Sequence, residues 1–219
     1  MPLYLEQSKH IPLGEVLSAM QDRIVGRTRY FGVPTQKNPL DFWVYQELLH
    51  VMRPDVIVEV GNKYGGSALA LAHLLDLLGH GRLIGVDIDH SGVHQVVRDH
   101  PRITLIEGDA PEMAAKVRGL ISPGERVLVI EDSSHTYENT LAVLRAYASL
   151  ISPGDYFIVE DSICHHGLDV GPNPGAYEAI EAFLAEDDSF ESDRGMESFV
   201  VTWNPRGFLR RRVGVGGRG

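Results

Sequence analysis

The sequence lacks the features that mark three broad classes of protein. Its 219 residues include one cysteine, Cys164, so no disulfide can form within the chain, and we expect a reducing compartment. Lys and Arg number 20 against 30 Asp and Glu, and the net charge of -10 argues against a nucleic-acid partner. No apolar run reaches the roughly eighteen residues of a membrane helix, and the first ten residues do not resemble a signal peptide. We therefore expect a cytoplasmic globular protein without a membrane partner.

Two glycine signatures for phosphate binding are also missing. The apolar run of residues 55–60 leads into a glycine-rich turn, E-x-G-x-x-x-G-G-S, over residues 59–67. A P-loop carries a lysine directly before its Ser or Thr, and this turn has none. The dinucleotide fingerprint G-x-G-x-x-G is absent as well, which argues against an NAD-dependent oxidoreductase but leaves it as an alternative.

Short β-branched runs alternate with segments of helical spacing along most of the chain. The expected helices span residues 39–52, 66–78, 92–99, 111–120, 137–150 and 175–186. The expected strands span residues 55–60, 82–89, 103–110, 126–135, 155–162, 197–205 and 207–213. Such alternation favours right-handed crossovers and a parallel sheet. We therefore predict an α/β fold with a mostly parallel seven-stranded sheet that ends in an antiparallel hairpin.

The chain divides into three parts on the same grounds. Residues 1–40 form a helical segment that we expect to act as a cap or lid over the site. Residues 41–213 form the main domain, which contains all of the expected sheet. The tail at 214–219, "GVGGRG", has few side chains that could pack, so we expect it to be disordered.

Three consecutive expected strands each end in an acid near one switch point of the sheet, where α/β proteins bind ligands. In the glycine turn, Gly61 and Gly65 allow close approach of a ligand, and Ser67 with the helix N-terminus offers donors to a carboxylate. Glu59 suits a cationic amine. Asp87, or Asp89, can accept hydrogen bonds from both ribose hydroxyls, and Asp109 lies where an adenine amino group could be recognised. Together these groups describe a site for S-adenosylmethionine.

A second acidic cluster follows at the ends of the next two strands. Asp132, Glu160 and Asp161 would converge at the same edge, where a hard divalent cation offsets their repulsion; oxygen ligands favour Mg²⁺, Mn²⁺ or Ca²⁺ over zinc. The alternative is that they are solvated acids or helix caps. His135 lies three residues after Asp132, and the ordinary pKa of histidine suits a general base.

The ordered motifs "EVGNKYGGS", "GVDID", "EDSSH", "IVEDS" and "TWNPRGFLRR" resemble the cephalosporin hydroxylase/rhamnosyl O-methyltransferase family over most of residues 30–212. More distantly, they are similar to macrocin-type sugar and catechol O-methyltransferases. The resemblance implies a Rossmann-like class I methyltransferase fold, S-adenosylmethionine and a divalent metal, on the positions named above. His135 falls where catechol enzymes carry a catalytic lysine and macrolide sugar enzymes a histidine base, which favours an alcohol acceptor. Asn62 and Lys63 inside the turn depart from the small or uncharged residues expected there.

The resulting hypothesis is a metal-dependent O-methyltransferase of natural-product biosynthesis. The metal would hold the acceptor hydroxyl, His135 would remove its proton, and the oxygen would attack the sulfonium methyl in line. The acceptor is expected to be a small molecule, with a sugar hydroxyl, a polyketide hydroxyl and a β-lactam nucleus all open. A homo-oligomer is possible. A non-catalytic S-adenosylmethionine-binding partner subunit is the second alternative, besides the oxidoreductase.

Overall fold

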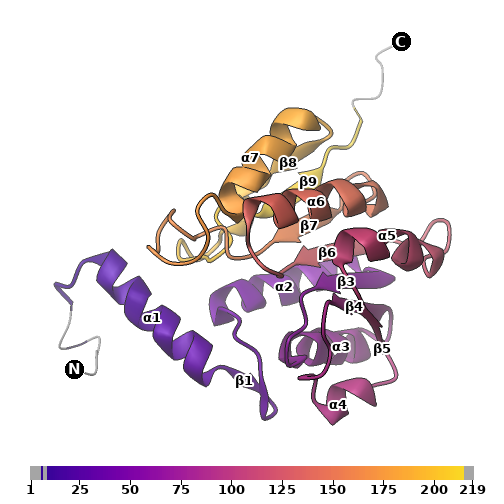
Figure 1. The fold of residues 1–219 in the computed structure, drawn as a ribbon, viewed down its shortest axis with the longest axis horizontal. Helices are drawn as coiled ribbons and strands as arrows, with labels where there is room; N and C mark the ends of the chain where they lie inside the picture. Colours follow the sequence, from indigo (N-terminus) through magenta and orange to yellow (C-terminus); the bar gives the residue numbers. More distant parts are fainter. Residues whose placement is uncertain (1–5, 7–8, 215–219) are drawn as a thin grey trace.

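The centre of the protein is a seven-stranded sheet, seen here in a computed structural model that describes residue 6 and residues 9–214 (Figure 1). Its strands are β3 (Val56–Val60), β4 (Arg82–Asp87), β5 (Ile103–Glu107), β6 (Val127–Glu131), β7 (Tyr156–Val159), β8 (Phe190–Ser192) and β9 (Phe208–Arg211). They are ordered β5-β4-β3-β6-β7-β9-β8, and the first five run parallel. The last two pairings, β7 with β9 and β9 with β8, are antiparallel. The predicted α/β architecture is confirmed.

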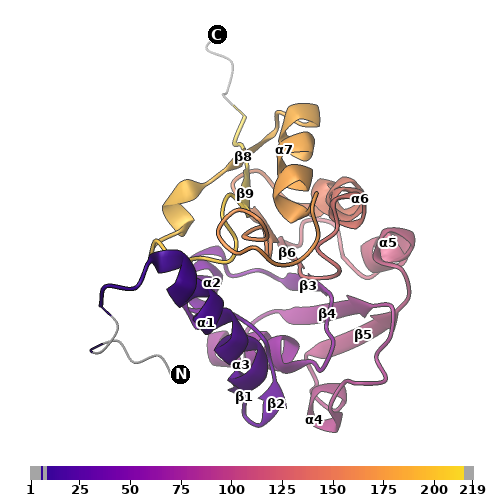
Figure 2. The same ribbon diagram turned by 60° about the vertical axis from the view of Figure 1, so that its left-hand side comes forward.

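Helices cover both faces of this sheet (Figures 1 and 2). One layer consists of α5 (Ala110–Gly119), α6 (Tyr137–Tyr147) and α7 (Ala176–Glu186), and the other of α2 (Pro39–Met52), α3 (Gly66–Leu78) and α4 (Gln95–Arg98). Because successive strand side chains point to opposite faces, Val58 packs in the first layer and Ile57 in the second. All five residues of β3 are buried, as expected for a central parallel strand.

One predicted strand is wrong. Residues 197–205 do not join the sheet. The strand that pairs with β9 at the edge of the sheet is β8, which precedes the short 3₁₀ helix Arg194–Met196. The tight turn exists, since the Gly207 N–H donates to the Asn204 carbonyl (2.8 Å), but it does not join two strands. The segment bonds elsewhere: the Thr202 hydroxyl and the Trp203 N–H donate to Asp41 at 2.5 and 2.8 Å. The bond from Trp203 satisfies a backbone N–H that pairing in a sheet would otherwise use, and the Thr202 hydroxyl adds a side-chain contact to α2.

The N-terminal part lies outside the two helical layers. Helix α1 (Leu13–Arg27) precedes a small antiparallel pair, β1 (Arg29–Tyr30) and β2 (Val33–Pro34). Helix α1 has its own apolar contacts, a cluster apart from the main core, made by Leu17, Ile24, Ile163, Leu168 and Trp203. Among the described residues, no helix has the length and apolar character needed to cross a membrane. Of the tail 214–219, which is expected to be disordered, residues 215–219 lie outside the described residues, so that expectation stays a prediction.

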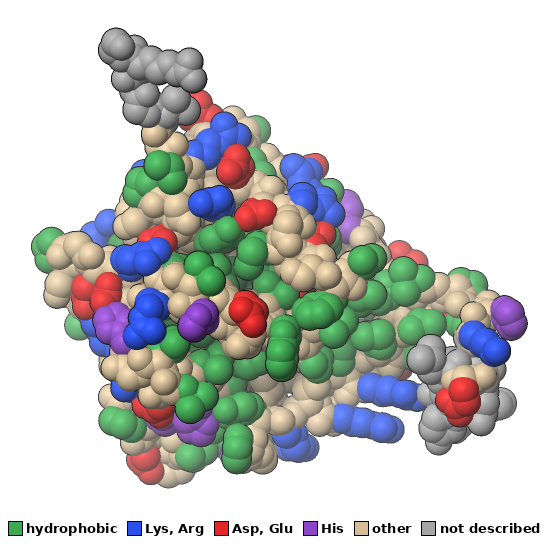
Figure 3. All heavy atoms as spheres, turned by 180° about the vertical axis from the view of Figure 1, so that it is seen from behind, with side chains coloured by type: hydrophobic (Ala, Val, Ile, Leu, Met, Phe, Trp, Pro, Cys, Tyr) green, Lys and Arg blue, Asp and Glu red, His purple; other side chains and the backbone are tan. Residues whose placement is uncertain are grey.

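Hydrophobic side chains form a band across the face opposite to that of Figure 1 (Figure 3). Large exposed apolar side chains include Trp43 and Val51 on α2 and Leu77 on α3, which are 61%, 76% and 85% exposed. None of the three lines the cavity described below. Self-association of the chain stays a prediction.

Candidate active site

A cavity of about 590 Å³ lies at the carboxyl ends of the five parallel strands. Each strand end contributes to its lining, and so does the N-terminal part. The lining includes Gly61 after β3, Asp87 of β4, Asp109 after β5, Asp132 and His135 after β6, and Asp161 after β7. The strand order reverses between β3 and β6, so the cavity sits at the topological switch point.

The glycine turn after β3 packs against the backbone of the neighbouring strand end. Gly61 has a φ of 90°, and a Cβ there would lie 2.0 Å from the Asp132 carbonyl oxygen. The backbone N–H groups of Asn62 and Lys63 donate to Asp87 Oδ2 at 2.7 and 2.9 Å. Asn62 and Lys63 are larger or more polar than the residues expected in this turn. They are compatible with it because they contact Asp87 through their backbone N–H groups and not through their side chains.

The predicted cofactor residues fall into two groups. Gly61, Ser67, Asp87 and Asp109 line the cavity. Gly65 is not a lining residue; it begins α3 in a left-handed conformation with a φ of 84°.

Glu59 lies beneath the cavity and does not line it. The Asn62 side-chain amide donates to Glu59 Oε2 at 2.8 Å. Burial raises the pKa of Glu59. The structure joins Glu59 to Asn62 of the turn by a hydrogen bond, and the expected role of Glu59 toward a bound amine stays a prediction.

A buried lysine, which the sequence reasoning missed, joins two of the predicted metal ligands. Lys37 Nζ lies 2.5 Å from Asp132 Oδ2 and 2.5 Å from Glu160 Oε1. The Tyr45 hydroxyl also donates to Glu160 Oε1, at 2.9 Å. Burial alone lowers the pKa of Lys37, but the charges of Asp132 and Glu160 outweigh it and raise the pKa. Part of the counter-charge that the acid cluster needs is thus supplied by the chain itself.

Three side chains on the cavity side of this lysine converge. Asp132, His135 and Asp161 each offer a ligand atom, all within 4.8 Å of one another. His135 Nε2 lies 3.4 Å from Asp161 Oδ2 and 3.9 Å from Asp132 Oδ1, and His135 Nδ1 is buried without a partner in the described part of the chain. Burial raises the pKa of Asp161 to about 6, and the charge of His135 opposes that shift. Glu160 stands behind this group, against Lys37.

The structure therefore brings Asp132, His135 and Asp161 together as expected, with Glu160 adjacent and engaged by Lys37. Neither carboxylate of the Asp132–Asp161 pair caps a helix; the residue before α6 is Thr136. Lys37 lies within the segment "GVPTQKNPLD", whose turn residues predict only a loop. No local signal could have found its contacts, because its partners lie 95 and 123 residues further along the chain.

Comparison with known proteins identifies relatives of this fold and site. Residues 22–212 match the family model described as Rhamnosyl O-methyltransferase/CmcI. The rhamnosyl O-methyltransferase of Mycobacterium tuberculosis is 35% identical over 193 residues, which cover 84% of this chain and 78% of that protein. The corresponding protein of Mycobacterium leprae is 36% identical over 194 residues, covering 84% and 83%.

Solved structures agree with these relatives. A structure of CmcI with Mg and SAM superposes with a TM-score of 0.68 at 28% identity and covers 85% of this chain and 77% of that one. An O-methyltransferase from Bacillus cereus in complex with SAH, 18% identical with a TM-score of 0.55, covers 84% and 86% and shares the fold. These relatives are methyltransferases, and none of them supports the oxidoreductase alternative.

Proposed function

The chain belongs to the Rhamnosyl O-methyltransferase/CmcI family and is an S-adenosylmethionine-dependent O-methyltransferase, and from this premise we propose that it methylates a sugar hydroxyl of a small molecule in a metal-dependent reaction. One observation carries the proposal. The groups suited to a nucleoside, Asp87 and Asp109, share a single cavity with the converging Asp132, His135 and Asp161. Donor and acceptor sites within one cavity are what in-line transfer requires.

The methyl donor would lie along the first three strand ends. The first turn of α3 and Ser67 would bind its carboxylate, because the N-terminal N–H groups of a helix favour anions. Asp87 would accept from the ribose hydroxyls, and Asp109 would lie beside the adenine. Glu59 would support this site by holding Asn62 in the turn.

The residues present fit a divalent cation. Asp132 and Asp161 would hold it from the cavity side, and Glu160 would join them if its contact with Lys37 is exchanged. Burial raises the pKa of Asp161, and the charge of the neighbouring Asp132 adds to that shift, so a cation between the two carboxylates would be favourable. When bound, the cation would lower the pKa of the acceptor hydroxyl.

His135 would take the proton of that hydroxyl as general base. The oxygen would then form a bond to the methyl carbon while the carbon–sulfur bond breaks and its electron pair stays on sulfur. The polar side chains of Gln21, Gln36, Ser134 and Asn139 line the same cavity and suit the several hydroxyls of a sugar ring. Helix α1, which carries Gln21, would close the site against water.

The test measures transfer of labelled methyl from S-adenosylmethionine to methyl α-L-rhamnoside, with catechol as the competing acceptor class. EDTA should abolish transfer and added Mg²⁺ should restore it. Asp132→Asn should lower kcat/KM by at least about a hundredfold, while the Kd for S-adenosylmethionine, from calorimetry, changes little. Asp188→Asn, an exposed acid remote from the cavity, is the matched control. Full activity of Asp132→Asn, or transfer unaffected by EDTA, would refute the metal role.

A further inference from the structure

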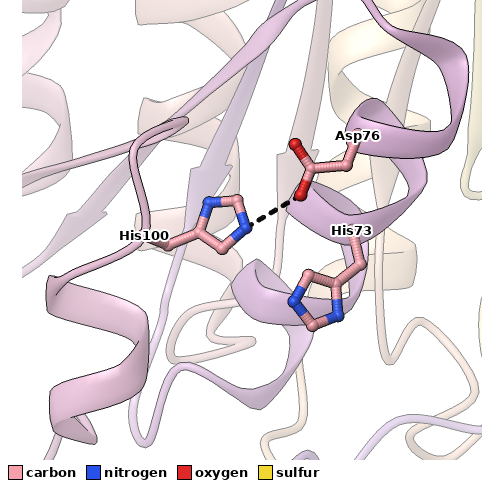
Figure 4. Close-up of side chains that lie close together, drawn as sticks. All are labelled: His73, Asp76 and His100. Atoms are coloured by element: carbon pink, nitrogen blue, oxygen red, sulfur yellow. Dashed lines mark hydrogen bonds and ion pairs between the residues drawn. The ribbon is translucent and has the colours of Figure 1, made fainter.

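A second cluster of ligating side chains lies on another part of the molecule. His73 and Asp76 occupy one face of α3, three residues apart, and His100 lies in the turn before β5 (Figure 4). Each offers a ligand atom, and these atoms all lie within 4.8 Å of one another. None of the three lines the cavity.

Neighbouring groups already orient each of these side chains. The Tyr30 hydroxyl lies 3.2 Å from His73 Nδ1, which leaves Nε2 of that ring available. Arg102 Nε donates to Asp76 Oδ1 at 2.5 Å, so Oδ2 is the oxygen that faces His100 Nε2, 3.1 Å away. The side chain of His100 is only 9% exposed. Partners of this kind fix the rings and carboxylates of metal sites in position.

We propose that His73, Asp76 and His100 form a site for a borderline transition metal ion, with Zn²⁺ as the natural occupant. Two imidazole nitrogens and one carboxylate oxygen suit Zn²⁺, whereas Mg²⁺ prefers oxygen ligands. The 3.1 Å separation of His100 Nε2 and Asp76 Oδ2 is close to the spacing of about 3.3 Å between two ligands of a tetrahedral ion with bonds of about 2.0 Å. Solvent would supply the fourth ligand at the exposed side of Asp76.

Binding requires a small exchange of hydrogen bonds. The ion would replace the contact between His100 Nε2 and Asp76 Oδ2, and the ring proton of His100 would move to Nδ1. The Arg102 backbone N–H, now 3.3 Å from Nδ1, would lose that acceptor. The Arg102 guanidinium keeps its donation to Asp76 Oδ1 and to the Gly81 carbonyl (2.6 Å), so the outer contacts survive.

Such an ion would connect parts of the fold that lead to the active site. It would join α3, whose first turn borders the cavity, to the segment before β5. The contact between the Tyr30 hydroxyl and His73 would also connect the ion to the β1–β2 pair, which precedes Lys37 in the chain. The proposed role of this ion is structural. Because its ligands lie outside the cavity, the site can be tested independently of methyl transfer.

The test is titration of the Asp132→Asn protein with Zn²⁺ by calorimetry and with Co²⁺ by visible absorption, in excess Mg²⁺ to occupy remaining oxygen sites. We expect one equivalent of tightly bound Zn²⁺ and the visible bands of tetrahedral Co²⁺. His73→Ala and His100→Ala should each weaken binding at least about tenfold. His80→Ala removes a histidine from another surface pair, with Asp55 at 2.9 Å, and should leave binding unchanged.

Three results would overturn the site: no Zn²⁺ binding, equal binding by the His100→Ala and His80→Ala proteins, or Co²⁺ spectra that do not depend on His73. Circular dichroism of each variant shows whether it is folded. If a variant fails to fold, NMR of the histidine rings in the Asp132→Asn protein decides the matter, because the His73 and His100 signals must shift at one equivalent of Zn²⁺.

Discussion

At the scale of single residues, Lys37 is the feature with the clearest consequence for the acid cluster. Its ammonium group is buried and contacts both Asp132 and Glu160, so it occupies the position from which a divalent cation would offset the same charges. A cation that binds Asp132 must either share that carboxylate with Lys37 or displace it. The lysine would therefore oppose the proposed metal binding and, in the absence of metal, would stabilise the folded chain.

Replacement of this lysine tests the competition. In Lys37→Met the acids lose their internal counter-charge, and we expect the affinity for Mn²⁺, measured by calorimetry or by paramagnetic resonance, to rise at least about tenfold. Without metal the variant should lose about 3 to 5 kcal/mol of unfolding free energy, because buried carboxylates are left unpaired. Lys116→Met, on the exposed side of α5, should change neither quantity. Unchanged or weaker Mn²⁺ binding by Lys37→Met would show that the lysine and the metal do not compete.

At the scale of elements, local patterns predicted most of the sheet and helices. Helices α2 and α3 begin and end where their apolar spacing and flanking residues predict. Apart from β3, whose end at Val60 is predicted correctly, the predicted strands that join the sheet end earlier than expected, because acids such as Asp109 and Asp132 belong to the turns that form the site. The prediction of a strand over residues 197–205 is wrong because their β-branched side chains favour a strand, whereas Asp41, distant in the sequence, accepts hydrogen bonds from Thr202 and Trp203. The contacts of Lys37 could not be predicted either, because its partners Asp132 and Glu160 are also distant in the sequence.

The turn between β3 and α3 requires glycine at position 61. In Gly61→Ala the new Cβ would collide with the Asp132 backbone and keep an unfavourable positive φ, so we expect a loss of more than about 3 kcal/mol in urea unfolding. Gly79 ends α3 with a φ of 66° but has no atom within 4 Å of a new Cβ. Gly79→Ala should therefore cost only about 1 kcal/mol. Equal losses in the two variants would mean that backbone strain alone, without the contact to Asp132, sets the cost at Gly61.

At the scale of the whole molecule, the cavity is lined by two parts of the chain that differ in the size of the apolar cluster that holds them. The strand ends belong to the main core, whereas Gln21 and Val25 reach the cavity from α1. Helix α1 depends on its small separate cluster with Ile163, Leu168 and Trp203. A segment held by few buried apolar contacts opens at lower free energy than the core. The wall of the cavity formed by α1 is thus the part suited to open for the acceptor.

Weakening that small cluster should open the cavity without unfolding the domain. Ile24 is 7% exposed, and Ile24→Ala removes about 2 to 5 kcal/mol from the docking of α1. We expect faster amide exchange confined to α1, a higher KM for the acceptor and an unchanged Kd for S-adenosylmethionine, whose proposed contacts are on the strand ends. Leu13→Ala, at a 58% exposed position of the same helix, is the control and should alter none of these. If Ile24→Ala speeds exchange throughout the sheet as well, α1 is part of the global folding unit and cannot act as a separate cover.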